Sequence, residues 1–276
     1  MTGHSRMVVL DTPDASGIID DMTLNDQSLI FPTVVCVPCF SGAPWDLDQL
    51  GPLASWPRRT MRLPERLAQV EAYADALAEG VNDLDSYVLA GDSFGAVISL
   101  TLALRQPVGL AGLVLSGGFP ANPLPKWKGI AGHLSRYAIG PLYHQGTLRI
   151  HAYQLHSTFD AHAEVPQTQT DYRRLFVENT PRRSYSARVT SVAHFDVVDR
   201  LRQVNVPTLI ITPADDRLVG EAAAKQMLDG IAGSREVVLP ETGHMFRFTH
   251  PTLYAQTIAD FLAEIPAPAA SAVSPR

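Results

Sequence analysis

Short apolar runs with little internal alternation recur along the sequence, at residues 33–37, 87–90, 110–115 and 206–212. Runs of this kind are typical of strands that are covered on both faces of a parallel sheet. Between strand-like runs, apolar residues follow a helical period, as at Leu67, Val70, Leu77 and Val81. The alternation of strand and helix predicts an α/β fold with a mostly parallel central sheet and helices on both of its faces.

Weaker patterns complete the predicted core. They predict further strands at residues 7–10, 18–24, 60–63 and 235–239. They predict further helices at about 45–53, from Pro64 onward, at 220–231 and at 251–265. The strands at 7–10 and 18–24 are expected at an edge of the sheet, joined by a turn-rich stretch.

The sequence pattern changes between residues 120 and 190, where prolines are followed by short amphipathic segments rich in His, Tyr and Arg. No buried strand is evident there. We interpret 120–190 as an inserted, mainly helical cap on a core formed by 1–119 and 191–265. Residues 266–276 are rich in Ala, Pro and Ser, and we expect a disordered tail.

Charge and composition narrow the classes of partner. The 276 residues carry a net charge of -6, so no basic field attracts nucleic acid or an anionic membrane. No apolar run approaches the roughly 20 residues that cross a bilayer, and residues 1–6 do not resemble a secretory leader. We therefore expect a soluble cytoplasmic protein that acts on a small molecule. No pattern in the sequence indicates the oligomeric state.

The predicted cap is basic, with nine Lys or Arg against four Asp or Glu. This excess is compatible with a substrate that carries an anionic group. Charge runs are more often solvated, or dock onto an oppositely charged surface, and the remainder of the chain is acidic. We favour this second interpretation.

Two patterns suggest metal binding at first sight. Cys36 and Cys39 form a C-x-x-C pair, but zinc needs two more ligands, and Cys36 lies inside an apolar run where cysteine acts as a small hydrophobe. The cap histidines lack the i, i+4 spacing of helical metal ligands; they are His144, His151, His156 and His162. We expect no metal and no other cofactor.

One motif carries the chemistry. Residues 87–90 lead into Gly-Asp-Ser-Phe-Gly, with Ser93 flanked by Gly91 and Gly95, and an apolar helix follows. A sharp turn from strand to helix strains its central residue and leaves room only for small neighbours, which explains the two glycines. The serine would lie over free N–H groups at the positive end of the helix, where a nucleophile and an oxyanion are stabilised.

Further candidates follow other predicted strands. The acidic pair Asp215 and Asp216 comes after the run at 206–212, and His244 comes after the strand at 235–239. The carboxyl ends of parallel strands are where α/β sheets place their sites. The loop after 33–37, residues 38–42, precedes another helix, and its N–H groups are expected near Ser93.

These residues, in the order Ser, Asp, His, resemble the α/β-hydrolase superfamily in its capped, single-domain serine hydrolase and esterase branch. The resemblance covers about residues 29–265 and is specific in combination. It implies Ser93 as nucleophile, His244 as base in preference to His250 or His194, and Asp216 as the acid, with Asp215 as the alternative.

The same resemblance places oxyanion donors at the backbone N–H groups of Phe94 and Phe40. The sequence departs from the family at Pro38-Cys39, where His-Gly is usual, and this hints at a thioesterase-like loop. Epoxide hydrolases and haloalkane dehalogenases of this fold carry Asp at the position of Ser93 and are disfavoured.

The resulting prediction is a serine hydrolase that cleaves a small carboxylic ester through an acyl-enzyme. The same three side chains would also suit a thioester, a lactone or a carbon–carbon bond next to a ketone. A non-catalytic ligand receptor is the alternative from another class.

Overall fold

The computed structural model describes residues 8–11, 31–123 and 141–265, with side chains for 31–123 and 144–265. Its strands form one seven-stranded sheet in the order β1-β3-β2-β4-β5-β6-β7. All neighbours are parallel except β1, which runs antiparallel to β3. The strands are Val8–Asp11 (β1), Thr33–Val37 (β2), Arg58–Arg62 (β3), Tyr87–Asp92 (β4), Leu110–Ser116 (β5), Thr208–Asp215 (β6) and Arg235–Gly243 (β7).

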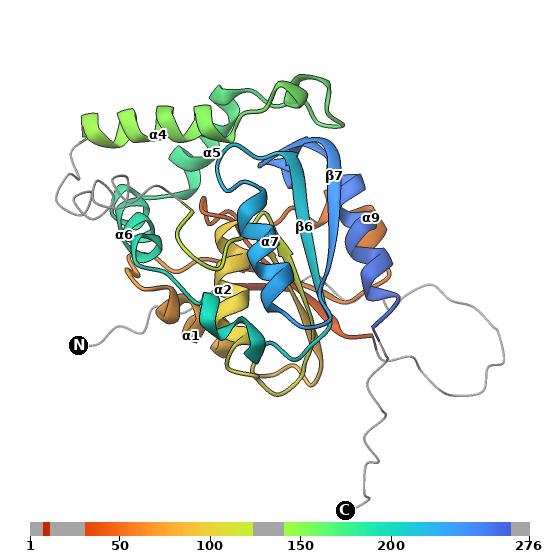
Figure 1. Cartoon of the computed structure of the whole chain (residues 1–276). Coiled ribbons are helices and arrows are strands. Elements are labelled where there is room, and N and C mark those ends of the chain that lie inside the picture. The colour runs from red at the N-terminus through yellow and green to blue at the C-terminus, as the bar shows by residue number, and fades with distance from the viewer. Residues whose placement is uncertain (1–7, 12–30, 124–140, 266–276) are drawn as a thin grey trace, which may run out of the picture.

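Helices surround this sheet (Figure 1). The α-helices are Val70–Gly80 (α1), Phe94–Ala103 (α2), Pro141–Leu155 (α4), Gln169–Asn179 (α5), Arg182–Ala193 (α6), Glu221–Gly230 (α7), Phe246–Thr249 (α8) and Pro251–Leu262 (α9). The short 3-10 helices are Leu47–Gln49 (η1), Gly51–Leu53 (η2), Thr158–His162 (η3) and Val198–Gln203 (η4).

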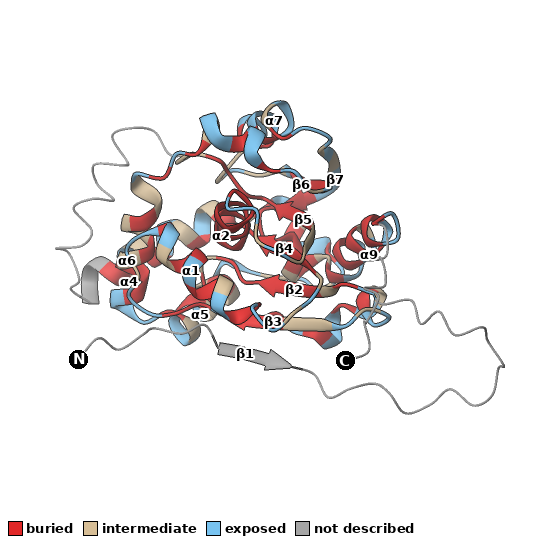
Figure 2. Ribbon diagram, turned by 90° about the horizontal axis from the view of Figure 1, so that it is seen from below, coloured by how far each residue is buried: buried red, intermediate tan, exposed pale blue. Residues whose placement is uncertain are grey.

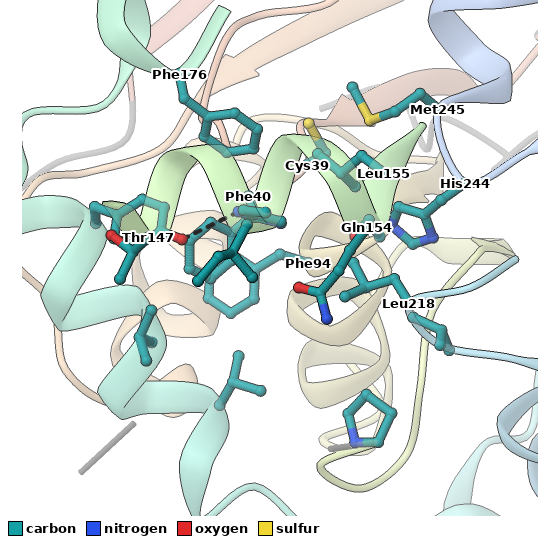
Figure 3. A pocket seen from close by; sticks show the side chains of 18 of the residues that line it. Cys39, Phe40, Phe94, Thr147, Gln154, Leu155, Phe176, Leu218, His244 and Met245 are labelled. Atoms are coloured by element: carbon teal, nitrogen blue, oxygen red, sulfur yellow. Dashed lines mark hydrogen bonds between the residues drawn. The ribbon is translucent and has the colours of Figure 1, made fainter. Parts of the chain in front are cut away.

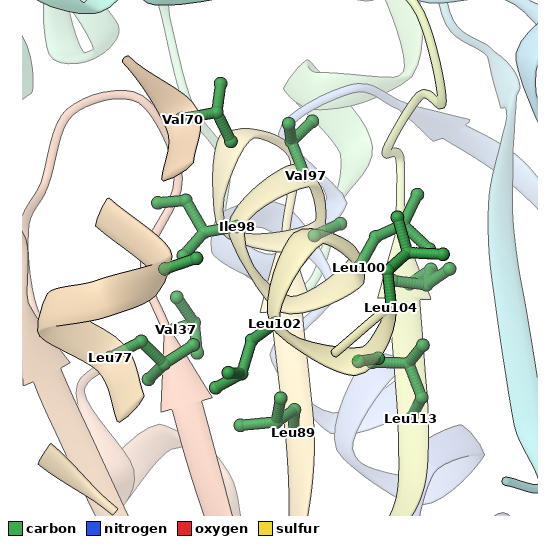
Figure 4. Packing of buried hydrophobic residues seen from close by; sticks show 14 of the residues in the cluster. Val37, Val70, Leu77, Leu89, Val97, Ile98, Leu100, Leu102, Leu104 and Leu113 are labelled. Atoms are coloured by element: carbon green, nitrogen blue, oxygen red, sulfur yellow. The ribbon is translucent and has the colours of Figure 1, made fainter. Parts of the chain in front are cut away.

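Each face of the sheet buries its own apolar cluster. Along β2, Val35 and Val37 pack with α1, α2 and α7 on one face, while Val34 and Cys36 pack with α9, η1 and η2 on the other. Figure 4 shows α2 seated between Leu77 of α1 and Leu113 of β5. In Figure 2 the central strands are red, and the outward sides of helices such as α7 are exposed. The hydrophobic effect on both faces therefore fixes the sheet in the middle of the core.

A third apolar cluster lies within helices α4, α5 and α6, which we call the α4–α6 layer. It joins Leu148, Phe176 and Tyr185 with Met245, which directly follows His244 at the end of β7. Figure 1 shows α4 across one end of the sheet. The layer therefore closes over the end of the sheet to which the predicted site residues belong.

The fold class is confirmed, and the strands predicted at 33–37, 60–63, 110–115, 206–212 and 235–239 are all present with shifts of a few residues. Two helix predictions are wrong. Residues 45–53 form η1 and η2 instead of one α-helix, because Pro52 lacks the N–H that a continuous helix would need and Leu50, between the two elements, has a non-helical backbone with φ -104° and ψ 48°. The helix expected from Pro64 begins only at Val70, since Arg66 has a left-handed φ of 63°.

The predicted cap contains helices and no described strand, but α6 continues to Ala193, beyond the expected boundary at 190. The division into core and cap stays a prediction. The strand predicted at 18–24, the first six residues and the tail at 266–276 lie outside the described residues. Among the described helices, none combines the length and apolarity needed to span a bilayer.

Candidate active site

Ser93 occupies the corner between β4 and α2. Its backbone has φ 56° and ψ -112°, a conformation that costs energy for a residue with a side chain. Its N–H donates to the carbonyl of Ser116 at 2.7 Å, which ties the corner to β5. A Cβ at Gly91 would collide with the Gly95 carbonyl, and one at Gly95 would collide with the Val37 carbonyl. Both flanking glycines are therefore required by close backbone contact, as the sequence pattern predicts.

His244 connects Ser93 to Asp216. The Oγ of Ser93 lies 2.9 Å from Nε2 of His244, and Nδ1 of His244 lies 2.8 Å from Oδ2 of Asp216. The other oxygen of Asp216 accepts the N–H groups of Leu218 and Val219, both at 2.9 Å. These two bonds fix the carboxylate, and the carboxylate fixes the imidazole. With Nδ1–H donated to Asp216, Nε2 is left to accept the Ser93 hydroxyl.

The two ionisable partners stabilise each other's charge. Burial lowers the pKa of His244, but the charge of Asp216 and its hydrogen bond outweigh burial and raise that pKa above its ordinary value. Burial raises the pKa of Asp216, yet the charge of His244 and the backbone N–H groups lower it overall. The pair is therefore arranged to hold a proton on His244 next to an ionised Asp216.

The alternative candidates lie in other settings. Asp215 accepts a hydrogen bond from Ser157 at 2.7 Å and forms an ion pair with Arg217 at 3.3 Å. His250 precedes α9 and bonds the hydroxyl of Thr249, while His194 directly follows the last residue of α6. The structure thus joins Asp216 and His244 to Ser93 and leaves Asp215, His250 and His194 out of this chain of hydrogen bonds.

The two predicted oxyanion donors flank the same corner. Phe94 is the first residue of α2, so its N–H has no acceptor within the helix. Phe40 lies in the loop after β2, and among the described residues its N–H has no protein acceptor. Their rings meet edge to face with centroids 5.6 Å apart. The loop and the helix start therefore lie next to each other beside Ser93.

Ser93 and His244 line a cavity of about 240 Å³ between the sheet and the α4–α6 layer. Figure 3 shows Phe40, Phe94 and Phe176 around this space. Most of its lining is apolar, and the described residues that line it include no Lys, Arg, Asp or Glu. Its polar members from α4 are Thr147, His151 and Gln154. The basic excess of the predicted cap is thus absent from the described wall of this cavity.

A sequence model of the alpha/beta hydrolase family matches residues 34–257 of the chain, which include Ser93, Asp216 and His244. The chain belongs to the alpha/beta hydrolase family. It is an enzyme of the hydrolase class, as its hydrolase-named relatives also indicate.

Individual relatives of this alpha/beta hydrolase differ in name. A Variovorax paradoxus (strain S110) protein, provisionally named carbamate hydrolase RutD, is 27% identical over 217 residues, 76% of this chain and 80% of its own. The 2-hydroxy-6-oxononadienedioate/2-hydroxy-6-oxononatrienedioate hydrolase of Escherichia coli (strain K12) is 28% identical over 193 residues. That match covers 66% of this chain and 64% of the relative, less than two thirds of its length.

Among solved structures, a thermophilic esterase from Thermogutta terrifontis resembles this alpha/beta hydrolase with a TM-score of 0.74. The two sequences are 18% identical, and the match covers 94% of this chain and 93% of the esterase. At this identity the likeness is one of fold.

Two features of the alpha/beta hydrolase site were not predicted from its sequence. His151 of α4 lines the cavity, where burial lowers its pKa to about 3 and the charge of nearby His244 adds to this. The other feature is a buried ion pair in which Asp92, the residue before Ser93, lies 2.6 Å from Arg247. The sequence shows these residues only as one more cap histidine and two isolated charges.

The two cysteines are buried, and two of the cap histidines pack against an aromatic ring. Cys36 and Cys39 are both buried and free, and burial raises the pKa of Cys36 to about 12. His151 and His144 pack against Tyr185. Within the described segments, no three His, Cys, Asp or Glu side chains gather as a metal site requires. The absence of a metal in this hydrolase stays a prediction.

Proposed function

We propose that this alpha/beta hydrolase cleaves a small, uncharged carboxylic ester through an acyl-enzyme on Ser93. The observation that carries the proposal is the continuous chain of hydrogen bonds from Ser93 through His244 to Asp216, opening onto a mostly apolar cavity. A serine hydroxyl is a poor nucleophile until a base accepts its proton. Here the base is in contact with the hydroxyl, and the base is itself oriented by a carboxylate.

In the proposed reaction, Ser93 Oγ attacks the ester carbonyl while His244 Nε2 takes the hydroxyl proton. The negative charge on the carbonyl oxygen is held by the N–H groups of Phe94 and Phe40. His244 then gives its proton to the leaving alcohol, and the acyl group stays on Ser93. A water molecule that loses its proton to His244 releases the acid, and the proton returns to Ser93. Asp216 stays ionised and stabilises the imidazolium in each half.

The cavity supports the choice of substrate class. Its volume of about 240 Å³ suits a small molecule, and burial of apolar atoms there favours an aliphatic or aromatic acyl group. A buried anion without a cation partner is costly, and the described lining offers no Lys or Arg. The basic surface of the predicted cap is therefore not a reason to expect an anionic substrate.

The rival reactions differ in the charge of their substrates and in the side chains that they require. The Escherichia coli relative is named for a dioate, a dicarboxylate, whose charges have no cation in the described lining. A thioester or a lactone would use the same three side chains. A non-catalytic receptor has no need for the hydrogen bonds that join Ser93, His244 and Asp216. We therefore rank the ester first, the thioester and lactone next, and the carbon–carbon bond after them.

The test has two stages. A fluorophosphonate probe should label the wild-type protein, and S93A should lose the label. Nitrophenyl esters of increasing acyl length, with matched thioesters, lactones and a vinylogous diketone, should then show turnover that is best with esters. Labelling that persists in S93A would place the nucleophile elsewhere. Labelling without ester turnover would favour the rival whose substrate is consumed, and no labelling or turnover of any kind would favour the receptor.

A further inference from the structure

Arg188 of α6 is a buried cation with an unusual set of partners. Only 1% of its surface is exposed, and among the described residues no carboxylate lies within ion-pair distance. Its Nη1 donates to the backbone carbonyl of Phe40 at 2.7 Å. Burial of a charge is costly, so a guanidinium retained in this place must be directed at specific acceptors. The carbonyl that accepts this bond belongs to Phe40, and the N–H of the same residue is a predicted oxyanion donor.

The loop is shaped to receive this guanidinium. A Cβ at Gly42 would lie 2.7 Å from Nη2 and 2.9 Å from Nη1 of Arg188, so any side chain there would displace it. Gly42 also has a φ of 76°, which favours glycine for a separate reason. The edge of the guanidinium that carries Nη1 and Nη2 thus lies against Gly42 of the loop, a two-nitrogen contact that the point charge of lysine does not reproduce.

A second bond comes from the same side. The hydroxyl of Thr180, between α5 and α6, donates to the carbonyl of Ser41 at 2.6 Å. Two successive loop carbonyls, those of Phe40 and Ser41, are therefore held by the α4–α6 layer. Because backbone carbonyls that are fixed in this way also fix the adjoining peptide planes, the loop has little freedom to rotate.

The side chain of Phe40 is held as well. Its ring contacts Phe176 and Tyr185 of the layer, with centroids 6.4 and 5.4 Å away, and Phe94 of the core. Phe40 is thus fixed through its ring and through its carbonyl. Its N–H is left for the cavity, where Phe40 is part of the lining.

We propose that Arg188 is a positioning residue, which holds the loop 38–42 so that the N–H of Phe40 meets the oxyanion. The inference rests on the proposed serine hydrolase function. Arg188 is not among the residues that line the cavity, so it acts through Phe40 and not by binding substrate. A donor that is held in place before reaction costs no reorganisation when charge develops, and this is the source of its value in the transition state.

The experiment compares R188M with R183M, which removes an exposed arginine of the same helix. For a nitrophenyl ester, R188M should lower kcat by about 10- to 100-fold, less than the roughly 100- to 1,000-fold that loss of an oxyanion donor causes. KM should change by less than about threefold, because the ground state does not use the oxyanion donor. R183M should match the wild type in both constants, and circular dichroism and thermal melting should show that each variant is folded.

An alkyl boronic acid supplies a readout that a purely structural role would not move. Its tetrahedral adduct with serine places an oxygen where the oxyanion forms, so its affinity should fall in R188M by the same factor as kcat/KM. Methylguanidinium should restore part of the activity of a folded R188A variant, while methylammonium at equal concentration should not. A folded R188M with wild-type kcat, or with raised KM and unchanged kcat, would overturn the proposal.

If R188M does not fold, R188K tests the positioning role in its place, because lysine keeps a buried cation at this position. We expect R188K to lose about tenfold in kcat at unchanged KM, since a single ammonium nitrogen cannot replace the two guanidinium nitrogens that lie against Gly42 while it also reaches the Phe40 carbonyl. Wild-type kcat in R188K would then refute the positioning role. If the wild type hydrolyses no ester, the proposed function fails on its own, and the rate of fluorophosphonate labelling of Ser93 still compares R188M or R188K with the wild type.

Discussion

At the scale of single residues, backbone geometry and backbone hydrogen bonds orient two of the three side chains of the site. Ser93 is fixed by a strained corner, and Asp216 by two backbone N–H groups from Leu218 and Val219. Among the described residues, the ring nitrogens of His244 hydrogen-bond to two side chains, those of Ser93 and Asp216, and to no backbone group. The imidazole is therefore the member whose position depends most on its neighbours.

The choice between the two acids is testable at this scale. Asp216→Asn should lower kcat/KM by about 10⁴-fold, because the amide presents the wrong group to Nδ1 and favours the wrong imidazole tautomer. The matched Asp215→Asn should cost less than about tenfold, since Asp215 bonds Ser157 and Arg217 instead. Steady-state kinetics of both variants checks this, and equal losses would contradict the assignment.

The same substitution has a consequence for pH dependence. Asp216 raises the pKa of His244, and in the proposed reaction His244 must be unprotonated to accept the Ser93 proton. Wild-type kcat/KM should therefore rise with pH through that raised pKa. In Asp216→Asn the acidic limb of the residual activity should move to lower pH. A limb that stays in place would mean that another group controls it.

His151 makes a separate contribution to stability. Burial lowers its pKa to about 3 in the folded protein, against about 6.5 when unfolded, so between these values only the unfolded chain takes up the proton. Stability then falls as the pH drops from 6.5 toward 3, by up to about 1.4 kcal/mol per pH unit. His151→Phe should flatten this dependence in urea unfolding between pH 6.5 and 4.5. An unchanged slope would show that the imidazole becomes protonated without unfolding.

At the scale of elements, the corner between β4 and α2 determines where the serine points. The start of α2 crosses so close to the end of β2 that Gly95 faces the carbonyl of Val37. All ten residues of α2 are buried, which is why its sequence is apolar on every side. The strand, the corner and the helix therefore act as one rigid unit under the site.

Gly95→Ala tests this packing. The added methyl would overlap the backbone of β2, and backbone cannot rotate away as a side chain does, so we expect a loss of roughly 3 kcal/mol in the free energy of unfolding. The control is Gly146→Ala on α4, an exposed position with no atom within 4 Å of the added Cβ. That change should add about 0.5–1 kcal/mol through helix propensity. Urea unfolding measures both, and a neutral Gly95→Ala would contradict the rigid corner.

The elements differ in how far the sequence predicted them. β2 and β5 were found because both faces are buried and their residues form continuous apolar runs. The corner at Ser93 was found because its glycines are a local steric requirement. The start of α1 was missed, since the left-handed φ of Arg66 has no residue signature. Local rules therefore predict an element when the constraint lies within the element itself.

Local sequence rules could not predict the contacts that the α4–α6 layer makes with the loop 38–42. The bond from Arg188 to Phe40 joins residues 148 positions apart, and that from Thr180 to Ser41 joins residues 139 apart. In the sequence Arg188 looks like one of nine basic residues of a charged segment. Only the packing of the layer on the sheet distinguishes it, because burial is a property of the assembled fold.

At the scale of the whole molecule, two layers divide the work of the proposed reaction. The sheet and α2 hold Ser93, Asp216 and His244, and these would be needed for any acyl group. The α4–α6 layer supplies much of the remaining wall of the cavity, including Leu155, Phe176 and Val189. Changes in this wall are therefore expected to alter which acyl group fits, with little effect on the reactivity of Ser93.

Val189→Phe on α6 tests this division. Val189 is half-buried and lines the cavity, so a larger ring there should take up space that a longer acyl chain needs. One methylene in an apolar pocket changes specificity by about 10- to 200-fold, so the loss in kcat/KM should grow from the acetyl to the octanoyl nitrophenyl ester. The control Val177→Phe is on the exposed side of α5, where Val177 is 53% exposed, and it should leave the profile unchanged.

Fluorophosphonate labelling separates choice of substrate from reactivity in the same variants. In the proposed mechanism the probe needs only Ser93, His244 and the predicted oxyanion donors, so a small probe should label Val189→Phe at close to the wild-type rate. A uniform loss for every ester together with slow labelling would mean that α6 disturbs the serine itself. A loss confined to long chains with normal labelling would show that the cavity wall sets acyl length while the chemistry stays with the sheet.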